Sequence, residues 1–291
     1  YIGKLMEQSS ETKDRFHFGH LIIDEGQDFP SEFFQTLYMI SSVWADRPYK
    51  LPSITVFADE NQTIQDENST INQILNSLAL PREKLKRLKR NYRNTKQIYD
   101  FASHFKVKPQ ETTAPTREGT KPKVVIAQSQ EYCVDYVTEM IKNNQDKSFL
   151  LVIGQRAGRQ LIKKYLGQLE ILLDRTDVEV AAYFNVGGGE GWMRRSVATP
   201  AEDLIFGSGH VNVIFDVSSK GTQADVVIYC GLEQYDVNVD STIKNRIYVN
   251  STRTFEELYF ILDDDSQMSK WNEIKAIFPN KELGFYDLEK I

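Results

Sequence analysis

Short apolar runs alternate with amphipathic segments along the chain, and the first of these runs is the most informative. Residues 20–23 read His-Leu-Ile-Ile, and the run stops abruptly at Asp24 and Glu25. Such a run predicts a short buried strand, whose C-terminal end faces the ligand side of a parallel sheet. Residues 31–40 then carry apolar side chains at helical spacing, which predicts a strand-to-helix turn at the two acids. Asp24 and Glu25 therefore either begin this turn and cap the helix, or take part in nucleotide chemistry.

The order of strand, turn and helix repeats along the rest of the chain. Further strands are expected at 54–58, 123–127, 149–154, 178–184, 211–217, 226–230 and 258–262, and helices at 71–80, 95–105, 132–142, 159–173, 243–251 and 269–278. This alternation predicts the α/β class with parallel sheets. A Pro- and Gly-containing linker at 106–121 predicts two domains, 1–105 and 106–291. The Gly-rich stretch 186–210 predicts an insertion or lid, because no Lys-Ser/Thr follows its glycines as in a phosphate loop.

Charge and composition restrict where partners can bind. The 291 residues include 35 basic and 41 acidic side chains, for a net charge of −6, so any nucleic-acid binding must be local. Seven of the basic residues lie between Arg82 and Arg93, where they form either a solvated face or a patch that follows phosphate groups. Cys133 and Cys230 lack metal-binding spacing, which favours a reduced, cytoplasmic protein. No apolar run approaches the roughly 20 residues that cross a membrane, so no membrane partner is expected.

Five stretches, taken in order, resemble the motifs of superfamily 1 helicases of the UvrD/Rep/PcrA type. They are Ile-Ile-Asp-Glu-Gly-Gln-Asp at 22–28, Ala-Asp-Glu-Asn-Gln-Thr-Ile at 58–64, Leu-Lys-Arg-Asn-Tyr-Arg at 88–93, Ser-Lys-Gly-Thr-Gln-Ala-Asp at 219–225 and Tyr-Val-Asn-Ser-Thr-Arg at 248–253. Each stretch is weak alone, but the ordered set is specific. The resemblance implies two RecA-like parallel-sheet domains, the first of them incomplete at its N-terminus.

The first two motifs imply residues for the metal and the attacking water. By the resemblance, Asp24 binds Mg²⁺, Glu25 is the catalytic base, and Gln62 senses the γ-phosphate of ATP. Two adjacent acids suit this division of roles, since one can hold the hydrated metal while the other polarises water.

The later motifs imply residues that contact the nucleotide. By the resemblance, Tyr92 stacks on the base, Arg93 contacts the γ-phosphate, and Arg253 is an arginine finger from the second domain. An aromatic face and a guanidinium fork are physically suited to these ligands. Lys220 and Gly221 are expected to touch phosphate of either ligand, and Gln223 is expected to meet the ribose.

Besides Ala58, which stands where the family has Gly, four positions depart from the family pattern. Gln223 stands where the family has Glu, Val217 where it has His, and Glu67-Asn68 where it has a DNA-stacking Trp-Arg pair. No Gly-x-x-x-x-Gly-Lys-Ser/Thr loop occurs anywhere in the sequence. The chain alone is therefore expected to hydrolyse ATP negligibly, unless a segment upstream of Tyr1 or a partner protein supplies that loop.

The expected function is the motor portion of an ATP-dependent helicase or translocase. Its cofactors would be ATP and Mg²⁺, and its partner would be single-stranded DNA, with RNA as the second choice. The rival hypothesis is a catalytically inactive helicase-like subunit that binds or assembles, for example in a defence or repair complex. The four departures and the absent phosphate loop favour the rival, whereas the retained acids and arginines favour the motor.

Overall fold

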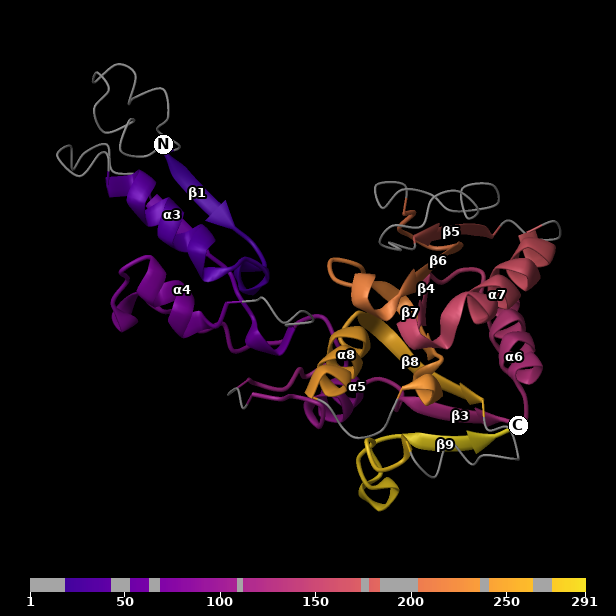
Figure 1. Ribbon diagram of the computed structural model, residues 1–291. Coiled ribbons are helices and arrows are strands. Elements are labelled where there is room, and N and C mark those ends of the chain that lie inside the picture. Colours follow the sequence, from indigo (N-terminus) through magenta and orange to yellow (C-terminus); the bar gives the residue numbers. More distant parts are fainter. Residues whose placement is uncertain are drawn as a thin grey trace. The chain divides into compact units, whose positions relative to one another are not determined.

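The computed structural model describes residues 19–42, 53–62, 69–108, 112–173, 178–183, 204–235, 241–263 and 274–291. The chain divides into two compact units, residues 1–88 and residues 89–291, whose elements are labelled in Figure 1. Several sequence expectations lie outside the described residues: Glu67-Asn68, most of the insertion at 186–210, and the first part of the helix at 269–278. None of the helices within the described ranges is long and apolar enough to cross a membrane.

The first unit contains a pair of parallel strands with helices packed against it. Its described elements are β1 (His20–Ile23), α3 (Ser31–Ser42), β2 (Ser53–Val56) and α4 (Ile71–Ser77). Ile23 of β1 pairs with Val56 of β2, so both strands end at the same edge. A small core joins Ile23 to Phe34 of α3 and Ile74 of α4. The first unit thereby places the residues after β1 beside those after β2.

The second unit is built on a larger parallel sheet. Its described elements are α5 (Lys96–Ser103), β3 (Lys123–Ala127), α6 (Gln130–Asn143), β4 (Phe149–Ile153), α7 (Gly158–Leu173), β5 (Glu179–Tyr183), β6 (His210–Phe215), β7 (Ala224–Cys230), α8 (Ser241–Ser251), β8 (Thr254–Asp263) and β9 (Asp287–Lys290). Seven strands pair in the order β5-β6-β4-β7-β8-β3-β9, and every pairing is parallel. The α/β class with parallel sheets is confirmed, and this arrangement is consistent with RecA-like domains.

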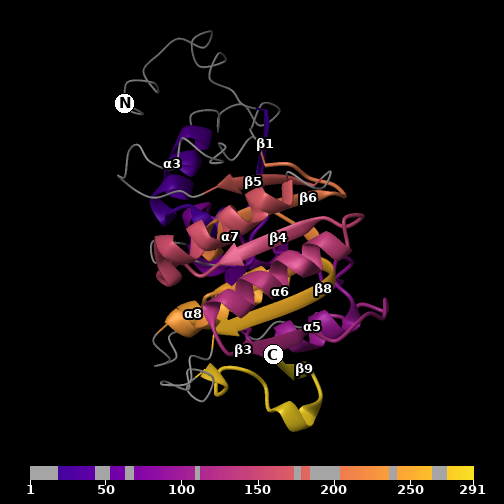
Figure 2. The same cartoon turned by 90° about the vertical axis from the view of Figure 1, so that its right-hand side faces the viewer.

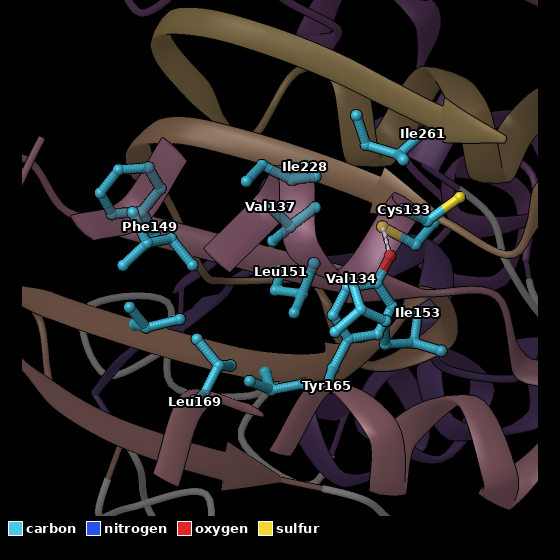
Figure 3. Close-up of a cluster of buried hydrophobic side chains, with 14 of the residues drawn as sticks. Cys133, Val134, Val137, Phe149, Leu151, Ile153, Tyr165, Leu169, Ile228 and Ile261 are labelled. Atoms are coloured by element: carbon cyan, nitrogen blue, oxygen red, sulfur yellow. Dashed lines mark hydrogen bonds between the residues drawn. The ribbon is translucent and has the colours of Figure 1, made fainter. Parts of the chain in front are cut away.

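Two hydrophobic cores lie on opposite faces of this sheet. Helices α6 and α7 cover one face and α5 and α8 the other, as Figure 2 shows. Successive residues of a strand point to opposite faces, and Leu151 of β4 accordingly faces α6 and α7 while Leu150 and Val152 face α5 and α8. Figure 3 shows the first core, in which the Tyr165 hydroxyl donates to the Cys230 sulfur over 3.2 Å. Burial on both faces explains why the central strands read as continuous apolar runs.

Two features of the second unit differ from the sequence expectations. Helix α5 was expected in a first domain ending at residue 105, but its residues Ile98 and Phe101 are buried in the core of the second unit, and the division falls after Leu88. Strand β9 was not expected, because its sequence Asp-Leu-Glu-Lys is largely polar. It pairs with β3 at the sheet edge, where charged side chains discourage pairing with other chains.

Candidate functional site

The candidate acids of the first unit follow the ends of its two strands. Asp24 and Glu25 come directly after β1, and a short 3-10 helix, Glu60–Gln62, follows β2. Asp24 accepts a hydrogen bond at 2.9 Å from the backbone N–H of Glu25. Glu25 has φ 50° and ψ 43°, the left-handed conformation that few non-glycine residues adopt. Such strain is retained where the surroundings impose it and is frequent at functional sites.

A buried glutamine connects the two candidate motifs of this unit. The amide nitrogen of Gln27 donates to the carboxylate of Glu25, and its amide oxygen accepts from the backbone N–H of Asp59 over 2.9 Å. Asp59 in turn accepts a 2.9 Å hydrogen bond from the side-chain amide of Gln62. Gln27 is fully buried, so its amide has little freedom to reorient. The structure therefore brings Glu25 and Gln62 into one hydrogen-bonded chain.

Gly26 permits the close approach of β1 and β2 at this edge. Its N–H donates to the carbonyl of Phe57 over 2.7 Å. A Cβ at this position would lie 2.3 Å from Cγ1 of Val56, well inside van der Waals contact. The lack of space for a side chain thus explains why glycine occupies position 26, between the candidate base Glu25 and Gln27.

The residues after β1 fit a magnesium ion only as part of a mixed ligand shell. Among the described residues, no group of three or more His, Cys, Asp or Glu side chains is arranged to hold a metal ion. Mg²⁺ commonly takes one or two carboxylates, several waters and substrate phosphate oxygens. Asp24 is exposed and can offer a carboxylate oxygen in that way. The donor set is compatible with Mg²⁺ delivered together with a nucleotide.

In the second unit, a buried asparagine joins two further candidate motifs. Asn94 is 1% exposed, and its side-chain amide donates to the carbonyls of Thr252 at 3.3 Å and Thr254 at 2.8 Å. The guanidinium of Arg93 also reaches the Thr252 carbonyl, at 3.4 Å. Because Thr252 and Thr254 flank Arg253, these bonds place the Asn-Tyr-Arg segment against the backbone around that arginine. Sequence reasoning did not single out Asn94.

Arg253 is buried rather than extended into solvent. Its side chain is 2% exposed, and its Nε donates to the carbonyl of Val249 in the last turn of α8 over 3.1 Å. The dipole of the helix C-terminus favours a cation there. Tyr92, in contrast, is 80% exposed. Of the two residues, Tyr92 has the ring available for stacking, while Arg253 is held against the end of α8.

The candidate loop between β6 and β7 contains a tight turn. The N–H and hydroxyl of Thr222 both donate to the carbonyl of Ser219, at 3.1 and 2.6 Å. Gly221 adopts φ 79°, and a Cβ there would meet no atom within 4 Å, so backbone conformation alone favours glycine. Lys220 is half-buried, and Gln223 is exposed at the end of the turn. The turn therefore presents Gly221 and Gln223 to solvent.

A buried carboxylate that sequence reasoning missed organises the start of this loop. Asp216 is fully buried and accepts hydrogen bonds from the hydroxyls of Tyr229 (2.8 Å) and Tyr235 (2.6 Å), and from Arg246 (3.3 Å). The backbone N–H of Gln155 adds a fourth donor at 3.2 Å. Burial, and then the adjacent carboxylate, raise the pKa of Tyr229 and of Tyr235. Asp216 follows directly on an apolar strand, as Asp24 does, and this pattern could have identified it.

Comparisons with known proteins show distant likenesses in structure. The C-terminal domain of a possible DNA helicase from Lactobacillus plantarum WCFS1 matches with 20% identity and a TM-score of 0.43, over 68% of this chain and 98% of that domain. An Arterivirus helicase, nonstructural protein 10, in complex with DNA matches with 11% identity and a TM-score of 0.35, over 67% of this chain and 37% of that protein.

A third likeness is to S. cerevisiae Dbp5 bound to Gle1, with 15% identity and a TM-score of 0.45, over all of this chain and 62% of that one. This chain therefore spans less than two thirds of the length of the latter two proteins. No protein-family model and no curated protein matches the sequence. With TM-scores this low, the likenesses carry no argument about function.

Proposed function

We propose that this chain is part of an ATP-dependent helicase or translocase of the UvrD/Rep/PcrA type that moves on single-stranded DNA. The observation that carries the proposal is the pairing of motifs within each unit. Gln27 bonds Glu25 to the Asp59 segment, and Asn94 bonds the Asn-Tyr-Arg segment to the backbone around Arg253. These bonds bring together motifs that lie far apart in the sequence.

The acids of the first unit would prepare the attacking water. Glu25 is held by the Gln27 amide, which orients the carboxylate as a base. Asp24 would carry Mg²⁺, which supplies neutralisation of the charge on the phosphate oxygens when it is bound. Gln62 is connected to Glu25 through Asp59 and Gln27, so a contact of Gln62 with the γ-phosphate would be transmitted to the base.

The second unit would stabilise charge and hold the nucleoside. Arg93 and Arg253 supply guanidinium groups, which bind phosphate oxygens in pairs and stabilise the transition state of phosphoryl transfer. Tyr92 would stack on the base, and Gln223 would bind the ribose through its amide. Lys220 and Gly221 lie in the turn that follows the Asp216 network, where Gly221 is exposed and Lys220 is half-buried. This position suits a contact with phosphate of the nucleotide or the nucleic acid.

The phosphate-binding loop that this reaction needs does not occur in the sequence. In the proposal it is contributed by residues outside these 291 or by a partner protein. The rival is an inactive helicase-like subunit that binds nucleic acid and assembles with other proteins. One observation favours it: Arg253, the proposed finger, is buried against the end of α8.

The test is ATP hydrolysis by the full-length protein, measured with and without a thymidine oligonucleotide. The motor predicts stimulation by the oligonucleotide, and loss of hydrolysis by roughly 100-fold or more in Glu25→Gln, because a general base contributes that much. Glu131→Gln, which changes an exposed acid on α6, is the matched control and should retain the activity. Binding of the oligonucleotide with no stimulated hydrolysis would instead support the inactive subunit.

A further inference from the structure

The segment from Arg82 to Arg93 concentrates positive charge in an acidic protein. It holds one acid, Glu83, and seven basic residues: Arg82, Lys84, Lys86, Arg87, Lys89, Arg90 and Arg93. Seven basic residues less one acid give +6, and the chain as a whole carries −6, so the remaining residues carry −12. A polyanion that approaches this chain is therefore repelled by most of it and attracted locally. We call residues 82–93 the basic segment.

Most side chains of the basic segment project into solvent. Every residue from Arg82 to Arg90 is exposed except Leu85, which is partly buried. Across the described residues, no ion pair involves Lys84, Lys86 or Arg87, and the same holds for Arg82 and Arg90. A solvated face of the usual kind alternates the two signs of charge and pairs them. The absence of such pairing within the described ranges favours binding of an external anion.

The backbone of this segment is anchored by hydrogen bonds towards its two ends. The N–H of Thr113 donates to the carbonyl of Lys89 over 2.6 Å, and the guanidinium of Arg117 donates to the carbonyl of Arg93 over 2.6 Å. At the other end, a 3-10 turn at Arg82–Lys84 is closed by a 3.0 Å bond between Leu85 N–H and Arg82 carbonyl. A backbone that is anchored at its ends loses less conformational entropy when a ligand binds than a free one.

We propose that residues 82–90 of the basic segment bind the sugar-phosphate backbone of a single-stranded nucleic acid without reading its base sequence. Residues 85–89 form neither a helix nor a strand, the elements that enter the major groove of a duplex to read bases. Leu88 lies between basic residues and is 82% exposed to solvent, so it offers apolar surface to unpaired bases. The inference rests on the proposed function, for which it names one place of contact with the nucleic acid.

The test compares two variants of the full-length protein that lose the same charge. In the first, Lys84, Lys86, Arg87 and Arg90 are changed to Gln. In the control, four exposed lysines elsewhere are changed to Gln: Lys121, Lys164, Lys281 and Lys290. The dissociation constant for a fluorescent thymidine oligonucleotide is measured by anisotropy between about 50 and 200 mM salt. Thermal unfolding of each variant confirms that the fold is retained.

The expected result is specific to the basic segment. Each lost phosphate contact lowers the slope of log affinity against log salt by about 0.7 for a single strand, so four contacts lower it by about 3. The first variant should bind at least about tenfold more weakly at the lowest salt, and the control should stay within about twofold of the wild type. Equal losses in the two variants, or no loss in the first, would overturn the inference.

Two further results separate this inference from the proposed function. Oligonucleotide binding that depends on the basic segment, in a protein with no stimulated ATP hydrolysis, would support the inference and count against the motor. If hydrolysis is stimulated by the oligonucleotide, and both the stimulation and the affinity are unchanged in the first variant, the motor is supported and the inference is overturned. Binding of phosphatidylserine vesicles through the basic segment, with no oligonucleotide binding, would also overturn the inference.

Discussion

Removing Arg246 tests whether the Asp216 network supports the second unit. Arg246→Met keeps much of the aliphatic stem but deletes the guanidinium that donates to Asp216 at 3.3 Å and to the Tyr235 hydroxyl at 2.7 Å. Asp216 then remains fully buried and has lost its counter-ion. Breaking a buried ion pair in this way typically costs about 3 to 5 kcal/mol.

The structure places the expected cost at the lower end of that range. Asp216 keeps three donors, the hydroxyls of Tyr229 and Tyr235 and the backbone N–H of Gln155. The side chain of Arg246 is 15% exposed, so solvent already moderates the pair. We therefore expect a loss of about 3 kcal/mol, which for a unit of this size lowers the melting temperature by about 6 to 12 °C.

The assay is thermal unfolding followed by circular dichroism, with two comparison variants. Arg156→Met removes an exposed guanidinium that lies 5.6 Å from the same Tyr235 ring, and it should cost below about 1 kcal/mol. The double variant Asp216→Asn with Arg246→Met should be less destabilised than the sum of its single changes, because the neutral amide needs no counter-ion. A melting temperature unchanged in Arg246→Met, or strictly additive losses in the double variant, would refute the reasoning.

Urea unfolding checks three further predictions. Asn94→Ala removes the amide that donates to the carbonyls of Thr252 and Thr254, of which Thr252 keeps Arg93 as a donor. It should cost about 2 kcal/mol, whereas the exposed Asn143→Ala should cost below about 0.5 kcal/mol. Gly26→Ala should destabilise the first unit by about 1 to 3 kcal/mol, because the new methyl collides with Val56. Burial raises the pKa of Glu233 to about 7, so folding favours its protonated form and stability is lost as the pH rises from about 4.5 through 7. Glu233→Gln should therefore stabilise the protein more at pH 8 than at pH 5, by about 2 to 3 kcal/mol.

The central strands were predictable because their burial is complete. Strand β3 has the bounds expected from its apolar run, and all five residues of β4 are buried. Where both faces of a strand are covered, composition alone indicates it. Strand β9 gave no such signal, because three of its four residues are charged and its pairing depends on a strand far away in the sequence.

The candidate residues were predictable by type and order, but their contacts were not. Resemblance pointed to Glu25, Arg93 and Arg253, yet the residues that hold their surroundings in place, Gln27 and Asn94, make long-range bonds that a linear pattern does not contain. The Pro and Gly content of residues 106–121 predicted a boundary there, whereas the two compact units divide after Leu88. Helix α5 instead packs with the second unit through apolar contacts formed only after folding.

The account depends most on the idea that the chain couples the binding of ATP to the binding of a single strand. The most direct measurement is the affinity of the full-length protein for a thymidine oligonucleotide with and without a saturating non-hydrolysable ATP analogue. Coupled binding predicts a change of about fivefold or more, which should disappear in Arg253→Ala. The same affinity with and without the analogue, although the analogue binds, would contradict the account.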